Sequence, residues 1–268
     1  MLNYLNSAVF TLGEKKFDYF VLTHTDKDHV GGAVKILDNF EVGKMLLPDV
    51  PSPTKTYTQV LNKIDEKKIN KDFNIAGLVL NVGKCKISFF SPYYNSVTNA
   101  IANNQSPIMI FEYCGKKLML TGDARQDLEK DMLKKEKDNL DYLDVDVLKV
   151  AHHGSETSSS MEFLLVVKPE FAVVSVGQGN RFDHPRQETL SRLKEIGVKD
   201  SSLYRTDING NVAMAINDDS TIVFKLGKNN FVVYYIQWEY VVVVALIFGA
   251  IVIFVPFKKL KKMKHPIK

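Results

Sequence analysis

The segment THTDKDHVGG at residues 23–32 concentrates side chains that bind metal ions. His24, Asp26, Asp28 and His29 fall within six residues, directly after the apolar run FDYFVL and before a glycine pair. Imidazoles and carboxylates are the ligands of borderline and hard divalent cations. Chance rarely places four such groups so densely after a buried strand. The segment therefore predicts a metal centre at the end of a strand.

Two further strand-like runs end in the same kinds of side chain. KLMLTGD places Asp123 just past one run, and DVLKVAHHGS places His152 and His153 just past another. Taken alone, such residues are most often turn formers or solvated loop groups. Taken together, three strand ends supply enough ligands for two cations that share a carboxylate, activate a water and stabilise a leaving oxygen.

The remaining pattern indicates a layered α/β protein, with sheets covered by helices. Helical periodicity occurs at 30–40, 127–137 and 187–196, and 57–71 is polar and helix-prone. Gly115-Lys116 predicts a hairpin turn between two strands. Strand-like runs occupy residues 17–22, 45–47, 78–82, 86–90, 108–113, 117–120, 145–151, 171–176, 203–205, 212–216 and 221–224.

Charge and cysteine content exclude some classes of protein. The net charge is +4, but residues 258–268 hold six lysines and no acid, which leaves −2 for residues 1–257. The body is therefore not a basic nucleic-acid binder by bulk charge. Cys85 and Cys114 lie in separate apolar segments, do not have the spacing of a zinc site, and do not fix the redox compartment.

The C-terminal part predicts a membrane anchor. Residues 241–257 carry no charge, aromatic residues precede them and lysines follow, as in a transmembrane helix with a cytoplasmic basic end. The alternative is a buried strand or core helix, and the β-branched content suits a strand. We expect an interfacial segment and transmembrane helix at 229–257 and a polybasic tail at 258–268. Residues 1 to about 235 would then face outward. Because residues 1–16 do not resemble a signal peptide, a tail-anchored protein with a cytosolic body is the alternative.

The succession of motifs resembles a known family. HxDxDH followed by GG is similar to the metallo-β-lactamase-fold signature in which the second histidine is aspartate. Further motifs in the same order resemble the ComEC/Rec2 competence-protein subfamily, namely NNQS at 103–106, TGD at 121–123, KVAHHGS at 149–155, SVGQGNRFDHP at 175–185 and YRTDING at 204–210. The resemblance covers residues 17–225. It implies an αββα sandwich over residues 1–228 with a dinuclear site at one edge of the sheets.

The resemblance also implies roles for residues. His24 and Asp26 would bind one metal, Asp28 and His29 the other, and Asp123 would bridge them. One histidine of the pair His152-His153 would complete the second site, and the other would support it or donate a proton to the leaving oxygen. The candidate catalytic groups are Asp28 and His153.

A second set of residues is expected to contact substrate. His184 is a candidate for a substrate phosphate, with a plain loop histidine as the alternative. Arg181 and Arg205 suit phosphate bidentately, and surface salt bridges are the alternative for both. Asn104 and Ser155 complete this predicted set.

The resemblance implies a hydrolase of phosphodiesters that acts on DNA during DNA uptake. We expect two divalent ions, with manganese favoured and zinc or magnesium as the alternatives. The Asp26 carboxylate hardens the first site, which favours manganese or magnesium over zinc. The expected partners are DNA, bound without sequence preference, the membrane through residues 239–257, and DNA-uptake channel proteins. The alternatives are a hydrolase of a small phosphodiester or phosphocholine-type ester, and a non-catalytic truncated membrane protein.

One feature departs from the family. Its members begin with a hairpin of strands before the HxDxDH strand, whereas only sixteen residues precede Phe17. We therefore expect the sandwich to lack its first strands and to expose a sheet edge.

Overall fold

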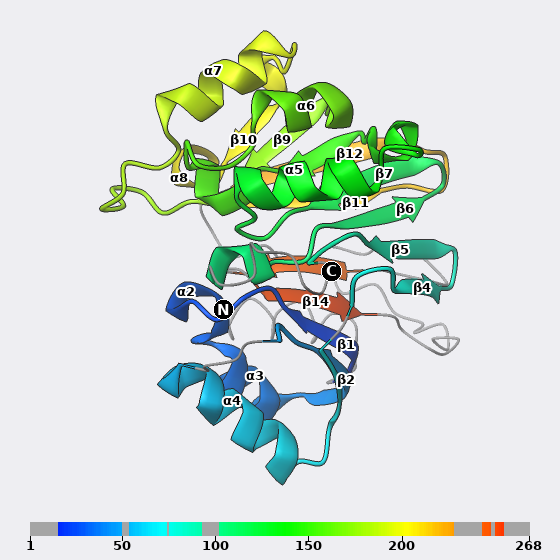
Figure 1. Ribbon diagram of the computed structural model, residues 1–268, viewed down its shortest axis with the longest axis vertical. Helices are drawn as coiled ribbons and strands as arrows, with labels where there is room; N and C mark the ends of the chain where they lie inside the picture. The colour runs from blue at the N-terminus through cyan, green and yellow to red at the C-terminus, as the bar shows by residue number, and fades with distance from the viewer. Residues whose placement is uncertain are drawn as a thin grey trace, which may run out of the picture.

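The computed structural model describes residues 16–49, 54–73, 75–92 and 102–227, and it describes 243–247 and 250–254 by their backbone. Two β-sheets pack face to face, and helices cover the outer face of each sheet (Figure 1). This arrangement confirms the predicted mixed α/β class. The predicted interfacial aromatic residues and the polybasic tail lie outside the described residues.

The first sheet is built around strand β1 (Lys16–Leu22). Strand β2 (Glu41–Leu46) pairs with it in parallel, and β3 (Asn70–Asp72) continues the sheet beyond β2. Side chains alternate across β1, because successive residues of a strand point to opposite faces. Phe20 and Leu22 pack under the helices, whereas Val21 packs between the two sheets.

The second sheet has seven strands in the order β10-β9-β8-β7-β6-β5-β4. Pairing is antiparallel from β4 to β7 and parallel from β7 to β10. The hairpin between β6 and β7 turns at Cys114 and Gly115, both with positive φ, one residue earlier than predicted. The strands are β4 (Val79–Val82), β5 (Cys85–Phe89), β6 (Met109–Tyr113), β7 (Lys116–Leu120), β8 (Val147–Lys149), β9 (Phe171–Val174) and β10 (Leu203–Arg205). A separate hairpin of β11 (Asn211–Ile216) and β12 (Ile222–Gly227) packs on the cluster between the sheets.

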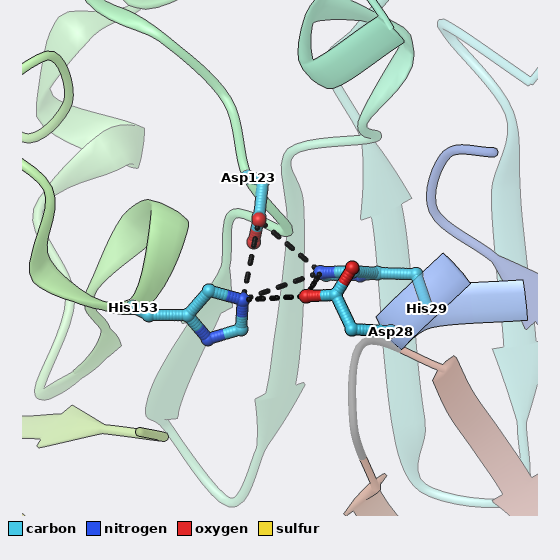
Figure 2. Close-up of side chains that lie close together, drawn as sticks. All are labelled: Asp28, His29, Asp123 and His153. Atoms are coloured by element: carbon cyan, nitrogen blue, oxygen red, sulfur yellow. Dashed lines mark hydrogen bonds and ion pairs between the residues drawn. The ribbon is translucent and has the colours of Figure 1, made fainter. Parts of the chain in front are cut away.

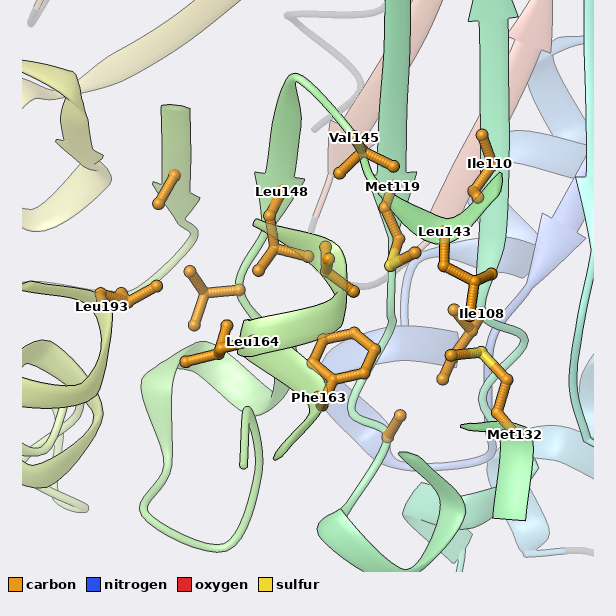
Figure 3. Close-up of a cluster of buried hydrophobic side chains, with 14 of the residues drawn as sticks. Ile108, Ile110, Met119, Met132, Leu143, Val145, Leu148, Phe163, Leu164 and Leu193 are labelled. Carbon is orange, nitrogen blue, oxygen red and sulfur yellow. The ribbon is translucent and has the colours of Figure 1, made fainter. Parts of the chain in front are cut away.

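Helices seal the outer faces. On the first sheet lie α2 (Lys27–Val30), α3 (Ala33–Asn39) and α4 (Lys55–Glu66), and Ile36 and Ile64 are fully buried there. On the second sheet lie α5 (Gln126–Lys135), α6 (Met161–Val167) and α7 (Gln187–Glu195). Figure 3 shows Met132, Phe163 and Leu193 from these three helices in one buried cluster. The short helix α8 (Thr206–Asn209) follows β10.

The helix α6 was not predicted from the sequence. Its residues MEFLLVV are almost all apolar, so the segment lacks the polar face that reveals a surface helix. The helix starts where the Ser160 side chain accepts a hydrogen bond from the Phe163 backbone N–H, an N-cap that satisfies one free donor of the first turn.

The C-terminal segment differs from its prediction. Where a transmembrane helix was expected at 241–257, the described residues form two strands, β13 (Val243–Ile247) and β14 (Ala250–Phe254). Valine and isoleucine favour extended backbone, and these strands pair with each other. Of the helices in the described residues, none has both the length and the apolar composition needed to cross a bilayer.

The same two strands cover the edge of the first sheet that was expected to be exposed. Strand β14 pairs antiparallel with β1, from Tyr19 opposite Ile253 to Leu22 opposite Ala250. The edge of β1 opposite β2 is therefore occupied by chain from the C-terminal part. Its backbone groups have hydrogen-bond partners that an open edge would lack.

A buried carboxylate ties α5 to the start of α6. Glu129 is fully buried, and its two oxygens accept from the backbone N–H groups of Ser159 at 2.5 Å and Ser160 at 2.8 Å. Burial raises the pKa of Glu129 to about 7, although the hydrogen bonds from Ser160 and Ser159 oppose the rise. The folded protein therefore holds this proton at a pH at which an unfolded chain has lost it.

This raised pKa predicts a pH-dependent stability. Between pH 4.5 and 7 the folded state binds the Glu129 proton more tightly than the unfolded chain does. The stabilisation of the folded state by this proton is therefore complete below pH 4.5 and is lost as pH rises to about 7. The loss should reach roughly 3 kcal/mol, at about 1.4 kcal/mol per pH unit. Urea unfolding from pH 4.5 to 8 measures it. The contribution of Glu129 is the difference in the free energy of unfolding between wild type and variant: Glu129→Gln should lack this loss as pH rises, whereas Glu162→Gln, which changes an exposed glutamate of α6, should follow the wild type at every pH. An equal loss in Glu129→Gln would contradict the assignment.

Candidate metal centre

The loops that follow β1, β7 and β8 meet at one edge of the two sheets. After β1 the chain stays extended at Asp26, which is the N-cap of α2, and α2 then carries Asp28 and His29. After β7 comes Asp123. Its neighbour Gly122 has φ +51, and a Cβ there would lie 2.7 Å from the Ser106 Cβ atom, so only glycine fits this turn.

One carboxylate oxygen is the centre of the site. Four imidazole Nε2 atoms approach Asp123 Oδ2, those of His29 at 3.1 Å, His153 at 3.3 Å, His24 at 3.9 Å and His152 at 4.0 Å. The Asp123 side chain is only 3% exposed. The structure thus brings together all four histidines that the sequence predicted as candidate metal ligands.

A compact group forms on one side of Asp123. Donor atoms of Asp28, His29, Asp123 and His153 all lie within 4.8 Å of one another, and Figure 2 shows them pointing at a common centre. His153 Nε2 is 3.3 Å from Asp28 Oδ2 and 3.4 Å from His29 Nε2. Two carboxylates and two imidazoles at this spacing can hold one divalent cation.

The other side of Asp123 carries His24 and Asp26. His24 Nε2 is 3.6 Å from Asp26 Oδ2, and it is buried without a hydrogen-bond partner among the described residues. The Oδ1 atom of Asp123 is also buried without such a bond. A buried donor or acceptor without a partner is costly, and a cation bound between His24 and Asp123 would satisfy the His24 Nε2 atom. The donor set therefore fits divalent cations.

Surrounding groups fix the orientation of the rings. His153 Nδ1 lies 2.7 Å from the Ser175 carbonyl, which only accepts, so Nδ1 carries a proton. When the ring is neutral, its Nε2 presents a lone pair to the centre. Thr23 Oγ1 contacts Nδ1 of both His24 and His29, and Ser106 Oγ contacts His24 Nδ1 while it accepts from the Asp123 backbone N–H. Such outer contacts set the direction of metal ligands.

The two adjacent histidines separate because both adopt the left-handed backbone conformation, His152 at φ 49 and His153 at φ 55. His153 joins the compact group, whereas His152 lies outside it. There His152 Nε2 lies 3.3 Å from Asn103 Nδ2, and its ring centroid is 5.7 Å from that of His184. Burial lowers the pKa of His152 to about 4, so this ring is neutral at pH 7.

Acids and imidazoles shift one another's pKa values in the compact group. Burial alone would raise the pKa of Asp123, but hydrogen bonds from His153 and His29 hold it well below its usual range. The hydrogen bond from His153 lowers the pKa of Asp28 to about 2. Burial lowers the pKa of His153, but Asp123 and Asp28 together raise it to about 9. Burial also lowers the pKa of His29. With no cation bound, the His153 proton therefore offsets part of the carboxylate charge.

Lys149 supplies a further positive charge behind Asp123. Its ammonium group is buried, donates to the Gly122 carbonyl at 2.8 Å and lies 3.7 Å from Asp123 Oδ1. This lysine was not singled out from the sequence, although it begins the motif KVAHHGS. A lysine inside an apolar strand is the signal that could have marked it, because buried lysines are rare unless they are paired.

The predicted substrate-contact residues lie in different places. His184 borders His152, and its neighbour Arg181 is exposed. Asn104 is fully buried and donates to Asp127 at 2.8 Å, and the Ser155 hydroxyl is buried against that of Thr157. These two side chains are held by the protein and brace the loops behind the centre.

Arg205 is also separated from the centre. Its guanidinium is held bidentately by Asp207, at 2.6 and 3.1 Å, which is the salt bridge named as its alternative. Asn103, which was not predicted, takes the place beside His152 instead of its neighbour Asn104. The sequence alone gave no basis to choose between two adjacent asparagines.

The raised His153 pKa predicts that cation binding releases a proton. Below about pH 9 His153 is protonated without a cation and must lose this proton to become a ligand, so metal affinity should rise with pH and level off above 9. Calorimetric titration with Mn²⁺ at pH 7.5, in two buffers of different ionisation enthalpy, should show about one proton released per ion at this position. His153→Ala should lose this release and bind at least about tenfold more weakly, whereas Asp138→Asn, at an exposed position, should match the wild type. Absence of proton release in the wild type would contradict the assignment.

Comparison with known proteins gives sequence matches to competence proteins, while no family model matches the chain. ComE operon protein 3 of Bacillus subtilis (strain 168) is 30% identical over 200 residues, which cover 75% of this chain and 25% of that protein. Competence protein ComA of Neisseria gonorrhoeae is 31% identical over 206 residues, with coverages of 77% and 26%. Recombination protein 2 of Haemophilus influenzae is 28% identical over 199 residues, with coverages of 74% and 22%. The chain thus spans about a quarter of the length of these relatives.

Solved structures also resemble the fold. The diiron β-hydroxylase CmlA of Streptomyces venezuelae has a TM-score of 0.49 and 11% identity, and covers 72% of this chain and 44% of its own. The metallo-β-lactamase fold protein YhfI of Bacillus subtilis has a TM-score of 0.45 and 12% identity, with coverages of 84% and 83%. Because both scores are below 0.5, the assignment rests on the sequence matches. They confirm the resemblance drawn from the motifs: over the matched region, this chain belongs to the ComEC/Rec2 family of competence proteins.

Proposed function

We propose that the chain is a metal-dependent hydrolase of phosphodiester bonds that acts on DNA without sequence preference and contributes to DNA uptake. One observation carries the proposal, namely the convergence of four imidazoles on Asp123 Oδ2 with Asp26 and Asp28 at the rim. The names of the relatives, which are competence and recombination proteins, support DNA as the substrate.

The residues divide into two ligand groups that share Asp123. His24 and Asp26 form the first group, and Asp28, His29 and His153 form the second. Divalent cations bound there would lower the pKa of a water molecule and neutralise charge that develops on phosphate oxygens. The protein fixes the ligands in advance, because His24, His29 and Asp123 are buried and hydrogen-bonded through their outer atoms.

Side chains of the protein can accept the proton of the attacking water, and the exposed side of the site gives water access to it. The Asp28 side chain is 55% exposed, so its carboxylate can take the proton of a water that attacks phosphorus from the solvent side. His153 keeps this carboxylate in place at 3.3 Å. The leaving oxygen would depart on the side lined by His152 and His184, where a neutral imidazole N–H can donate a hydrogen bond to it while solvent water supplies its proton.

Affinity for DNA would depend on local basic side chains. The −2 charge of residues 1–257 gives no general attraction for a polyanion, so we expect weak, strongly salt-dependent binding. Arg181 is the arginine suited to this role, because it is exposed and makes no ion pair within the described residues. By contrast, Arg186 pairs with Glu156, and Arg205 pairs with Asp207. Contact with DNA-uptake channel proteins is part of the same proposal.

The nuclease proposal predicts metal-dependent cleavage of DNA by the full chain. A fluorescent oligonucleotide should be cut in the presence of divalent cations and not in the presence of a chelator. Asp123→Ala removes the shared ligand and should lower kcat by about a thousand-fold or more, whereas Asp138→Asn should leave it unchanged. No cleavage by a folded protein that binds metal would redirect the proposal to a small phosphodiester. Absence of both cleavage and bound metal would indicate a non-catalytic protein.

Metal preference is a separate prediction. The carboxylate of Asp26 makes the first ligand group harder than a pair of imidazoles, so Mn²⁺ should support faster turnover than Zn²⁺. Asp26→His should shift the preference toward Zn²⁺, as measured by activity of the metal-free protein reconstituted with each ion. Turnover of the wild type with Zn²⁺ alone and none with Mn²⁺ would refute this part of the proposal.

A further inference from the structure

The loop after β9 presents an aromatic ring to solvent. Phe182 is 57% exposed, and it is the only aromatic residue among the large hydrophobic side chains that are exposed in the described part of the chain. The others are aliphatic, namely Val79, Leu165, Ile208, Val223 and Leu226. A single exposed apolar side chain is ordinary on a protein surface, so the groups around Phe182 decide whether the ring has a role.

The loop holds this ring in a fixed position. The Asn180 side-chain oxygen accepts from the backbone N–H groups of Phe182 at 3.2 Å and His184 at 3.0 Å. The amide nitrogen of the same side chain donates to the carbonyls of Gly177 and His184. Four hydrogen bonds from one side chain thus close the turn from both ends. The ring is pre-organised, which lowers the entropy lost when a ligand binds.

A row of rings connects Phe182 to the metal centre. The Phe182 ring is stacked with that of His184 at 5.7 Å between centroids, with 22° between their planes. His184 in turn lies 5.7 Å from His152, and His152 Nε2 lies 4.0 Å from Asp123 Oδ2. The exposed ring is therefore two ring-to-ring steps from the histidine that contacts the shared ligand, close to where a bound phosphate would react.

A free positive charge accompanies the ring. The Arg181 guanidinium carbon lies 4.7 Å from the centre of the Phe182 ring, and Arg181 has no acidic partner within the described residues. The guanidinium lies over the ring, and more than half of the Phe182 residue is still exposed to solvent. This pair matches the two parts of a nucleotide, because a base can stack on the exposed part of the ring while the phosphate pairs with the cation. A purely apolar partner would leave this charge without a counterion.

These observations lead to one inference, which rests on the proposed function and specifies its substrate. We propose that Phe182, supported by His184 and Arg181, is a stacking platform for an unpaired base next to the scissile phosphate, so that the enzyme prefers single-stranded DNA. In a duplex each base is paired and stacked on its neighbours, and its face reaches a protein ring only after costly unstacking. A single strand presents its base faces freely.

Substrates with and without a base test the platform. The full chain would be assayed on single-stranded oligothymidylate, on the same strand with an abasic sugar at each position near the cut, and on the matching duplex. The wild type should cleave oligothymidylate with a KM well below those for the abasic strand and the duplex. Phe182→Ala should raise the KM for oligothymidylate by about 5- to 100-fold and leave cleavage of the abasic strand unchanged. Phe182→Trp should preserve the low KM.

Two controls separate stacking from other causes. Leu165→Ala removes an exposed apolar side chain from α6 and should alter no KM. Arg181→Gln should weaken binding of the normal and abasic strands alike and reduce the salt dependence, because its contact is with phosphate.

Three outcomes would overturn the inference. Equal effects of Phe182→Ala on both strands, or no effect on either, would show that the base does not stack on this ring while the nuclease proposal stands. Equal KM values of the wild type for duplex and single strand would refute the preference. If the wild type neither binds nor cleaves any of the three substrates, the nuclease proposal itself fails, and the inference fails with it.

Discussion

The carboxylate of Asp123 is the constraint on which the rest of the site depends. A buried charge is tolerated in a protein interior only when opposite charges and hydrogen bonds surround it. Four imidazoles face its Oδ2 atom, and the ammonium group of Lys149 lies behind Oδ1. Asp123 follows β7, and its partners come from the ends of β1 and β8, so the two sheets must pack with these three strand ends at one edge. The sandwich is thus the frame that this single buried acid requires.

Hydrogen bonds behind the ligands turn this convergence into a defined geometry. Ser106 links the Asp123 backbone to His24, and Thr23 links His24 to His29, so the two sheets are joined by small hydroxyl side chains. The Ser175 carbonyl sets the direction of the His153 ring. The inner wall of the site is therefore buried and held by hydrogen bonds. The rim is different, because Asp26 and Asp28 are each about half exposed and can respond to a cation or a substrate.

The C-terminal strands show how local preference and tertiary context compete. A run of seventeen uncharged residues suits both a membrane helix and a buried strand, and the aromatic and lysine flanks favoured the helix. In the structure the described part of the run forms β13 and β14, and β14 pairs with β1. A free strand edge is a strong template for an extended segment rich in valine and isoleucine. Hydropathy alone does not record that such an edge is present.

The sequence by itself determined the ligand types, their order along the chain and their position at strand ends, because apolar runs followed by His and Asp are visible without any structure. It also determined the α/β class and most helices, through their periodicity. Only the tertiary structure separated His152 from His153 and placed His153 in the compact group, since the two consecutive left-handed backbone conformations cannot be read from the sequence. Only the tertiary structure showed that Asn104 is buried and that the Phe182 ring is linked to His152 through His184. Each of these facts is set by distances between segments far apart in the chain, and such distances do not exist until the sheets have packed.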